Sequence, residues 1–350
     1  MYRLVQRRGI IGLFCLLFVA SSVVPGWAQK DNRFEVSKNL DIFNSLLKEV
    51  EMFYVDSVDV DKTVQRGIEA MLAGLDPYTE YYPEQKTEEL SLMTTGEYGG
   101  IGSLIRQRNN EGGVMIAEPT EGMPADLAGL KPGDLILAID TIDVSKATNS
   151  RVSELLKGVP NTKMVLTIQR PGEKKPRKFE ITRKQITTPQ VTYYGVKNDS
   201  IGYIYLKAFT IKSAQEVKEA FLDLKKNHNI KSLVLDLRGN GGGVLEGAVQ
   251  IVGMFVPKGS EVLSTKGKIK QWDRTYRTST EPLDTVMPLA ILINGGTASA
   301  AEIVSGSLQD MDRAVLVGQR SFGKGLVQAP RDLPYNGKVK ITMSKYYISS

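Results

Sequence analysis

Three short stretches of the sequence carry residue types that acyl-transfer chemistry uses. The first, NGGTASAAEI at residues 294–303, places Ser299 among small side chains where an apolar run gives way to a helical pattern. At a helix N-terminus the alkoxide of Ser299 would be favoured by the helix dipole and by free N–H groups, including that of Ala300. The alternative is that Ser299 is a helix cap, as at most strand-to-helix junctions of this kind.

The second stretch, DLRGNGGG at residues 236–243, ends a strand-like run in a glycine-rich loop. Backbone N–H groups that point outward from such a loop can bind an anion or a developing oxyanion. A phosphate loop is the competing interpretation, but neither GxxxxGK[ST] nor GxGxxG is present, so nucleotide binding lacks positive support. Taken alone this signal is weak, because most glycine-rich turns are merely turns.

The third stretch is SFGKGLVQ at residues 321–328, which holds Lys324 between two glycines. Phe322 and Leu326 predict apolar surroundings for its amine. Desolvation favours the neutral form of a lysine, which could then accept a proton from Ser299. The amide of Gln328, four residues further on, could orient that amine.

The chain has one histidine, His228, at the polar end of a helical pattern. A solvated side chain is expected there. One histidine cannot make an HExxH zinc site, and a Ser-His-Asp triad would depend on this single unpromising residue. A Ser-Lys dyad needs no histidine, so Lys324 is the better candidate for the base.

The N-terminus predicts export. Residues 1–28 combine a basic start, an apolar stretch and small residues at the end, as a signal peptide does; an uncleaved anchor is the alternative. The only cysteine, Cys15, lies in this segment, so the mature chain would have no disulfide, thiolate zinc site or cysteine nucleophile. Cleavage after Ala28 would lower the formal net charge from +6 to +3, which removes the main support for nucleic-acid binding.

Two regions of different periodicity precede the three stretches. Residues 29–95 show helical apolar faces, one of them formed by Ile42, Leu46, Val50 and Phe53. They are predicted to form a packing subdomain or an arm for dimerisation. Residues 96–184 contain short strand-like runs and two short helical patterns, which predict a small, partly open β-barrel.

From residue 185 to residue 350 the sequence alternates strand and helix patterns. Alternating elements of this length predict an α/β core that binds ligands at the carboxyl ends of its strands, where the three stretches fall. The polar segment 260–280 interrupts the alternation and is predicted to be a cap over the site.

The motifs, their spacing and the domain order resemble the carboxyl-terminal processing, or tail-specific, serine proteases over nearly all of the mature chain. In that family a serine in an xASAxEI stretch precedes a lysine in FGKG by 25 residues, and a glutamine follows four residues later. Ser299, Lys324 and Gln328 match these spacings. The resemblance implies a Ser-Lys endopeptidase with a crotonase-like α/β core, an inserted PDZ domain and an N-terminal helical segment.

The resemblance assigns further residues to the site. DLRGNGGG matches the family's oxyanion loop, which puts Gly242, with Gly241 as the alternative, beside Ala300 as N–H donors. EYGGIGSLI matches the carboxylate-binding loop of a PDZ domain, whose exposed edge adds a substrate's C-terminus as a strand. Lys157 matches a basic residue that in relatives often links the PDZ domain to the protease. The implied tail-binding residues are Tyr98, Gly99, Gly100, Ile101, Gly102 and Lys157.

The sequence departs from the family pattern at Gly241, where proline is common, and at Ala301, where serine is frequent. Both changes exchange one small residue for another. The chain ends at KYYISS, inside a strand-like run where relatives usually continue, which predicts a core truncated at its C-terminus.

The resemblance implies protein substrates with exposed C-termini, a periplasmic or envelope location, and no metal or cofactor. A homodimer through the N-terminal helices and an adaptor protein are compatible with it. Two alternatives stay open: a PDZ-containing binding protein with a non-catalytic core, and a crotonase-like hydratase or isomerase acting on acyl-thioesters.

Overall fold

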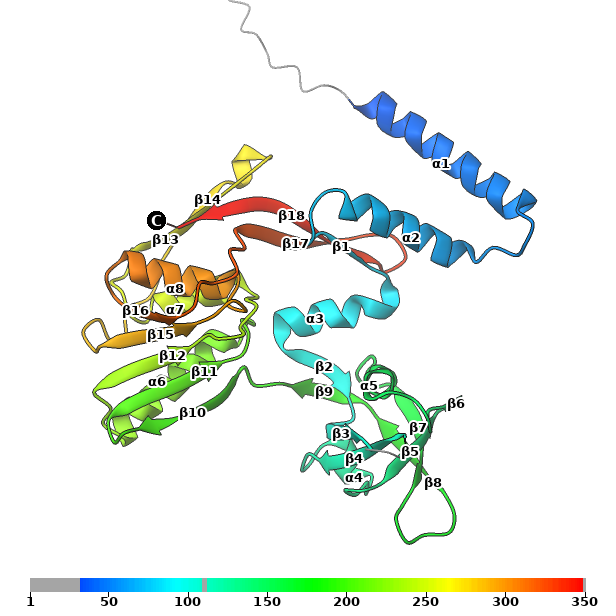
Figure 1. The fold of residues 1–350 in the computed structure, drawn as a ribbon, viewed down its shortest axis with the longest axis horizontal. Coiled ribbons are helices and arrows are strands. Elements are labelled where there is room, and N and C mark those ends of the chain that lie inside the picture. The colour runs from blue at the N-terminus through cyan, green and yellow to red at the C-terminus, as the bar shows by residue number, and fades with distance from the viewer. Residues whose placement is uncertain (1–31, 109–111, 349–350) are drawn as a thin grey trace, which may run out of the picture. The chain divides into compact units, whose positions relative to one another are not determined.

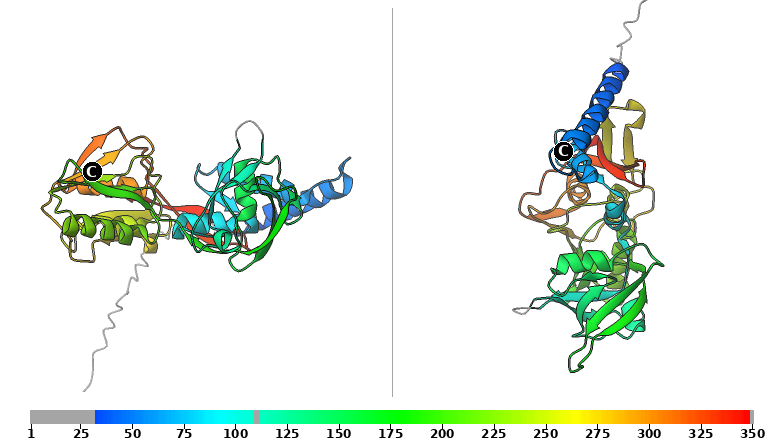
Figure 2. Two further views of the ribbon diagram at one scale, coloured as in Figure 1. Left: turned by 90° about the horizontal axis from the view of Figure 1, so that it is seen from below. Right: turned by 90° about the vertical axis from the view of Figure 1, so that its right-hand side faces the viewer.

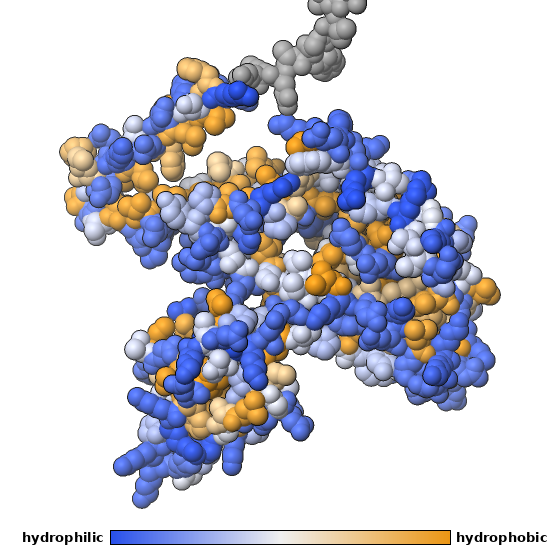
Figure 3. All heavy atoms as spheres, turned by 180° about the vertical axis from the view of Figure 1, so that it is seen from behind, coloured by the Kyte–Doolittle hydropathy of each residue, from blue (hydrophilic) through white to orange (hydrophobic). Residues whose placement is uncertain are grey.

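The computed structural model describes residues 32–108 and 112–348, and the chain divides into two compact units at Gly67. The predicted signal segment, residues 1–28, lies outside the described residues. The first unit contains helix α1 (Arg33–Phe53) and the start of helix α2 (Val60–Ala73), which continues into the second unit. The predicted helical periodicity of α1 is confirmed, and most of its large apolar side chains are exposed (Figure 3). Neither described range contains a helix long and apolar enough to cross a bilayer.

The predicted small β-domain begins and ends in one two-stranded ribbon (Figure 1). In this ribbon β2 (Glu97–Gly100) pairs antiparallel with β9 (Lys184–Thr187). The domain's sheet has the order β3-β4-β5-β7-β8, with β6 paired to β5, and the two predicted helices are present. Its elements are β3 (Ser103–Gln107), β4 (Val114–Pro119), α4 (Pro124–Leu127), β5 (Leu135–Ile139), β6 (Ile142–Asp143), α5 (Asn149–Leu156), β7 (Lys163–Gln169) and β8 (Arg177–Thr182). Burial alternates along β7, as in a strand with one face on a core.

The α/β core is built on a five-stranded sheet of order β10-β11-β12-β15-β16, parallel except for the β10–β11 pair. Helix α6 packs on β10 and β11, and helices α7 and α8 pack against each other (Figure 2). The predicted strand-helix alternation is present, with β10 in addition. Its elements are β10 (Val191–Lys197), β11 (Ile201–Leu206), α6 (Ser213–Asn227), β12 (Ser232–Asp236), α7 (Leu245–Val252), β15 (Leu289–Ile293), α8 (Ala300–Asp310) and β16 (Val315–Gly318).

A second, antiparallel sheet joins strands from distant parts of the chain, in the order β1-β18-β13-β14, with β17 also paired to β18. Its strands are β1 (Glu80–Tyr82), β13 (Glu261–Gly267), β14 (Arg274–Arg277), β17 (Leu326–Asp332) and β18 (Lys338–Tyr347). Between β1 and the ribbon lie a short 3-10 helix (Glu84–Lys86) and α3 (Thr87–Thr95), and a second 3-10 turn (Lys270–Trp272) joins β13 to β14.

The segment predicted as a cap is therefore a hairpin of this second sheet. Val262 and Leu263 of β13 are buried in the hydrophobic core, so its first strand has a structural role. The expectation that the segment also covers the site stays a prediction.

Candidate active site

Ser299 lies at the junction between β15 and α8 with φ 55° and ψ −117°. A positive φ is unfavourable for a residue with a side chain and costs on the order of 1–3 kcal/mol. It persists here because the preceding loop is fixed from both sides. The hydroxyl of the buried Thr297 donates to the carbonyl of Leu237 at 2.8 Å and accepts from the amide of Asn294 at 3.0 Å. The sequence thus holds a strained serine at the start of a helix.

The glycine-rich loop after β12 lies directly beside Ser299. The amide of Ala298 donates to the carbonyl of Asn240 at 2.9 Å, which joins the two loops. Gly242 has φ 93°, and a Cβ there would lie 2.8 Å from Ser299 Cβ and 2.9 Å from the amide nitrogen of Ala300. Glycine is required at this position because both the backbone conformation and the close approach exclude a side chain.

Two backbone N–H groups near Ser299 have no hydrogen-bond partner within the described residues. Ala300 is the first residue of α8, so its amide has no acceptor within the helix. The amide of Gly241 is likewise unengaged, and Gly241 is exposed. In contrast, the amide of Gly242 donates to Asn240 Oδ1 at 2.9 Å. Of the two glycines predicted as donors, Gly241 is therefore the one with a free N–H in this arrangement.

Lys324 lies in the loop before β17, with its Nζ 4.4 Å from the centroid of the Tyr78 ring. Burial lowers the pKa of Lys324, the positive charge of Lys340 lowers it further, and the carboxylates of Glu80 and Asp76 oppose the shift. The direction agrees with the sequence-based expectation of a desolvated amine. The source of burial differs, because Phe322 is 58% exposed and the aromatic ring against the amine belongs to Tyr78.

Gln328 makes no hydrogen bond with the amine of Lys324 within the described residues. Its Nε2 donates to Thr342 Oγ1 at 3.2 Å, and the amide of Thr342 donates to Thr79 Oγ1 at 3.1 Å. The Thr79 hydroxyl in turn donates to Asp76 Oδ2 at 2.8 Å. Gln328 thereby belongs to a hydrogen-bonded chain that fixes the segment carrying Tyr78. Within the described residues no hydrogen bond joins Lys324 Nζ to Ser299 or to Gln328.

Glu302, which the sequence analysis did not single out, connects the two candidate catalytic residues. Its Oε2 accepts from the amide of Ser299 at 2.7 Å and from the amide of Lys324 at 2.9 Å. Its Oε1 accepts from the Ser321 hydroxyl at 2.7 Å and from the amide of Gly323 at 2.6 Å. One carboxylate therefore holds the Ser299 junction and the loop that carries Lys324 together. Ser299 and Glu302 have the spacing of a capping box, and this pattern is the sequence signal that could have identified Glu302 as part of the site.

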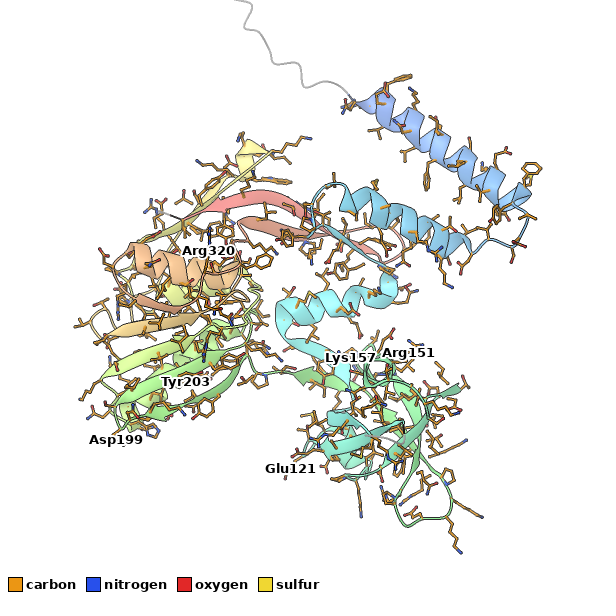
Figure 4. The ribbon with its side chains drawn as sticks, viewed as in Figure 1. Glu121, Arg151, Lys157, Asp199, Tyr203 and Arg320 are labelled. Atoms are coloured by element: carbon orange, nitrogen blue, oxygen red, sulfur yellow. The ribbon has the colours of Figure 1, made fainter. Side chains whose placement is uncertain are left out.

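Asp236 supports the base of the glycine-rich loop. Its carboxylate is buried and accepts from the Tyr203 hydroxyl at 2.6 Å and from Arg238 Nη2 at 2.6 Å; Tyr203 lies on β11 (Figure 4). Burial alone would raise the pKa of Asp236, but the bonds from Arg238 and Tyr203 outweigh it and lower the pKa. The ion pair fixes the point at which β12 turns into the loop.

His228 lies at the C-terminal end of α6 with its side chain 52% exposed. Its Nε2 is 3.8 Å from Asp223, a residue of the same helix. The predicted solvated position is confirmed.

A small groove of about 40 Å³ lies between the start of β3 and helix α5 of the β-domain. Its lining residues are Tyr98, Gly100, Ile101, Gly102, Ser103, Ile105, Ser153, Leu156 and Lys157. Five of the six predicted tail-binding residues thus line one groove. The sixth, Gly99, lies beside it, and its carbonyl accepts from the amide of Gly158 at 3.1 Å.

Lys157 is positioned at the end of α5, where it follows the last helical residue (Figure 4). Its Nζ lies 5.3 Å from the centroid of the Tyr98 ring. The C-terminal carbonyls of α5 at Leu155 and Leu156 are held by the Arg183 guanidinium at 3.0 and 3.1 Å. Lys157 itself lines the groove together with Tyr98.

The chain is similar to proteins of a known family. Residues 115–170 match the PDZ domain, and residues 200–350 match peptidase family S41. The carboxy-terminal-processing protease of Bartonella bacilliformis is 35% identical over 96% of this chain and 76% of the relative. A probable CtpA-like serine protease of Staphylococcus aureus is 33% identical over 88% of this chain, which spans 61% of that relative's length. A solved structure of a photosystem II D1 C-terminal processing protease aligns over 89% of each chain at 28% identity, with a TM-score of 0.48. The predicted family resemblance and the fold class, an α/β core with an inserted PDZ domain, are confirmed.

Proposed function

Because the chain belongs to the carboxy-terminal-processing proteases of peptidase family S41, we propose that it is an exported serine endopeptidase with a Ser299–Lys324 dyad. The observation that carries the proposal is the shared Glu302 carboxylate, which binds the amides of both residues. It brings a strained serine and a lysine of lowered pKa to one place. Such a pair is suited to nucleophilic catalysis without histidine.

In the proposed reaction the neutral amine of Lys324 takes the proton of Ser299 Oγ as that oxygen attacks a peptide carbonyl of the substrate. The amine of Lys324 lies over the ring of Tyr78 in this structure, so it must first move from that ring to Ser299 Oγ. The free N–H groups of Ala300 and Gly241 stabilise the oxyanion. Lys324 then protonates the leaving amine, and a water molecule, deprotonated by the same residue, hydrolyses the acyl-enzyme.

The groove of the PDZ domain is proposed to select the substrate by its C-terminus. A chain end added along the groove would bring its carboxylate to the backbone at Gly100–Gly102 and to the ammonium of Lys157. Export is proposed from residues 1–28 of the sequence. The exposed apolar face of α1 supports the proposal of a homodimer formed through the N-terminal helices.

A peptide ending in apolar residues is expected to bind at least about tenfold more tightly with a free C-terminal carboxylate than with a carboxamide, because charge-assisted hydrogen bonds are the stronger ones. Lys157→Met should bring the two affinities closer together, whereas Lys175→Met, at an exposed position of the same domain, should not. Titration calorimetry on the Ser299→Ala protein measures both peptides without cleavage. Equal affinities for the two peptides in the parent protein would contradict tail recognition.

The proteolytic activity is tested separately, with an unstructured protein ending in apolar residues and fragments read by mass spectrometry. Cleavage near the C-terminus that disappears in Ser299→Ala supports the proposal. Binding of the tail without cleavage by the parent protein would favour the alternative of a PDZ-containing binding protein.

Cleavage is expected to increase with pH and level off above the pKa of Lys324, because only the neutral amine accepts a proton. Lys340→Met should move the midpoint to higher pH. The variant removes the positive charge of Lys340, which lowers the pKa of Lys324. It also breaks the 2.5 Å ion pair between Lys340 and Glu80, and the unpaired Glu80 carboxylate should raise the pKa of Lys324 more strongly. Glu80→Gln should move the midpoint to lower pH for the converse reasons. The measurement is kcat/KM against pH.

Lys345→Met provides the control for these two variants, since Lys345 lies on the same strand as Lys340 with an exposed side chain. Its profile should match that of the parent protein. A midpoint that is the same in all four proteins would show that Lys324 is not the titrating base.

A further inference from the structure

Tyr346, on β18, reaches the backbone of both proposed catalytic residues. Its hydroxyl donates a hydrogen bond to the carbonyl oxygen of Lys324, and the carbonyl oxygen of Ser299 lies 3.4 Å from the same hydroxyl. A hydroxyl has one proton, so the bond to Lys324 is the principal one and the contact with Ser299 is secondary. The amide of Tyr346 also donates to the carbonyl of Gly325 at 3.1 Å.

The Tyr346 hydroxyl is a reliable donor in this environment. The side chain is partly buried and packs against the hydrophobic core. Burial raises the pKa of Tyr346 and the negative charge of Glu302 raises it further, so the phenol stays protonated throughout the pH range in which a lysine base would operate.

The lysine loop needs such an anchor because Lys324 has glycine on both sides. Gly323 has φ 90°, and glycine restricts the backbone less than any other residue. Glu302 fixes the amide on the N-terminal side of Lys324. The peptide plane on its C-terminal side is fixed by Tyr346, which binds the carbonyls of Lys324 and Gly325. Both planes together determine the direction in which the lysine side chain leaves the backbone.

We propose that Tyr346 is a positioning residue of the dyad, an inference that rests on the proposed function. Glu302 accepts from the amides of Ser299 and Lys324, and the Tyr346 hydroxyl donates to the carbonyl of Lys324, with the carbonyl of Ser299 at 3.4 Å. The two side chains thus hold the backbone of the same pair of residues. A displacement of about 1 Å at a reacting group can lower a rate about 100-fold. Loss of the hydroxyl should therefore act on the chemical step and not on substrate binding.

Tyr346→Phe tests the proposal, since it keeps the ring and removes only the donor. We expect kcat to fall about 10- to 100-fold with KM changed less than about twofold. Hydrogen exchange of peptides covering residues 321–326 should become faster. Tyr347→Phe is the matched control, because Tyr347 is adjacent on the strand and 47% exposed, and it should change neither readout.

The two readouts separate failure of this inference from failure of the proposed function. Unchanged exchange in Tyr346→Phe would overturn the anchoring role, whatever the catalytic mechanism. Faster exchange with unchanged kcat would overturn the positioning role. Cleavage of the substrate by Ser299→Ala would contradict the proposed dyad. The positioning role of Tyr346 depends on that dyad and would be contradicted by the same result.

Discussion

Ser299→Ala is expected to lower kcat by about 10⁴-fold or more, because it removes the oxygen that would form the acyl-enzyme bond. Binding of a substrate tail should be unaffected, since the groove is lined by residues of the PDZ domain. The comparison requires parent and variant proteins purified side by side, with fragments of an unstructured substrate quantified by mass spectrometry. Equal cleavage by both proteins would indicate a contaminant and reject the assignment of Ser299.

Lys324→Arg and Lys324→Met together determine what the lysine contributes. Arginine keeps the positive charge but stays protonated in proteins, so it cannot act as a general base. Both variants are therefore expected to lose about as much activity as Ser299→Ala. A Lys324→Arg protein that retained substantial activity would show that position 324 acts through its charge and would contradict proton transfer by this residue.

The residues proposed for the chemistry could be predicted from sequence because they occur in short local motifs. Ser299 follows an apolar run and two glycines and precedes a helical pattern, and the structure has a strand, a loop and a helix in that order. The proposed tail-binding residues also lie close together in the sequence, apart from Lys157. Local patterns of this kind fix which backbone segments meet, since connected elements in an α/β core are neighbours in space.

The surroundings of Lys324 could not be predicted in this way. The pairing of β1 with β18 places Glu80 opposite Lys340, 260 positions later in the chain. Nothing in the local sequence of either strand specifies this register, yet it determines which charges act on the amine. Phe322, the apolar neighbour that the sequence suggested, is exposed, and Tyr78 provides the ring in contact with the amine.

The glycine-rich loop proposed to bind the oxyanion shows a second limit of prediction from sequence. A run of glycines predicts free backbone N–H groups but not how many there are, because a nearby side chain can accept a hydrogen bond from one of these N–H groups. The Asn240 side chain accepts from the amide of Gly242 and donates to the carbonyl of Leu206 at 2.9 Å. The choice between Gly241 and Gly242 as donor depends on this buried amide, whose orientation is set by packing.

Glu302→Gln is expected to lower kcat by about 100- to 1,000-fold, a smaller loss than that of the Ser299 and Lys324 variants. A neutral amide has one acceptor oxygen, whereas the carboxylate accepts from four donors in two loops. At least two of those donors would lose their acceptor, and both loops carry proposed catalytic residues. The thermal midpoint should also fall, because Glu302 is a negative charge in the first turn of α8.

Ser321→Ala distinguishes loss of positioning from loss of stability. It removes one hydrogen bond to Glu302 without touching the amides of Ser299 or Lys324, so kcat should change less than about threefold. Measured at a temperature well below both midpoints, a large loss of kcat in Glu302→Gln alone would mean that this carboxylate holds the dyad in register. Similar small losses in both variants would mean that the Glu302 carboxylate is not needed to position Ser299 and Lys324. The shared Glu302 carboxylate would then no longer support the proposed function.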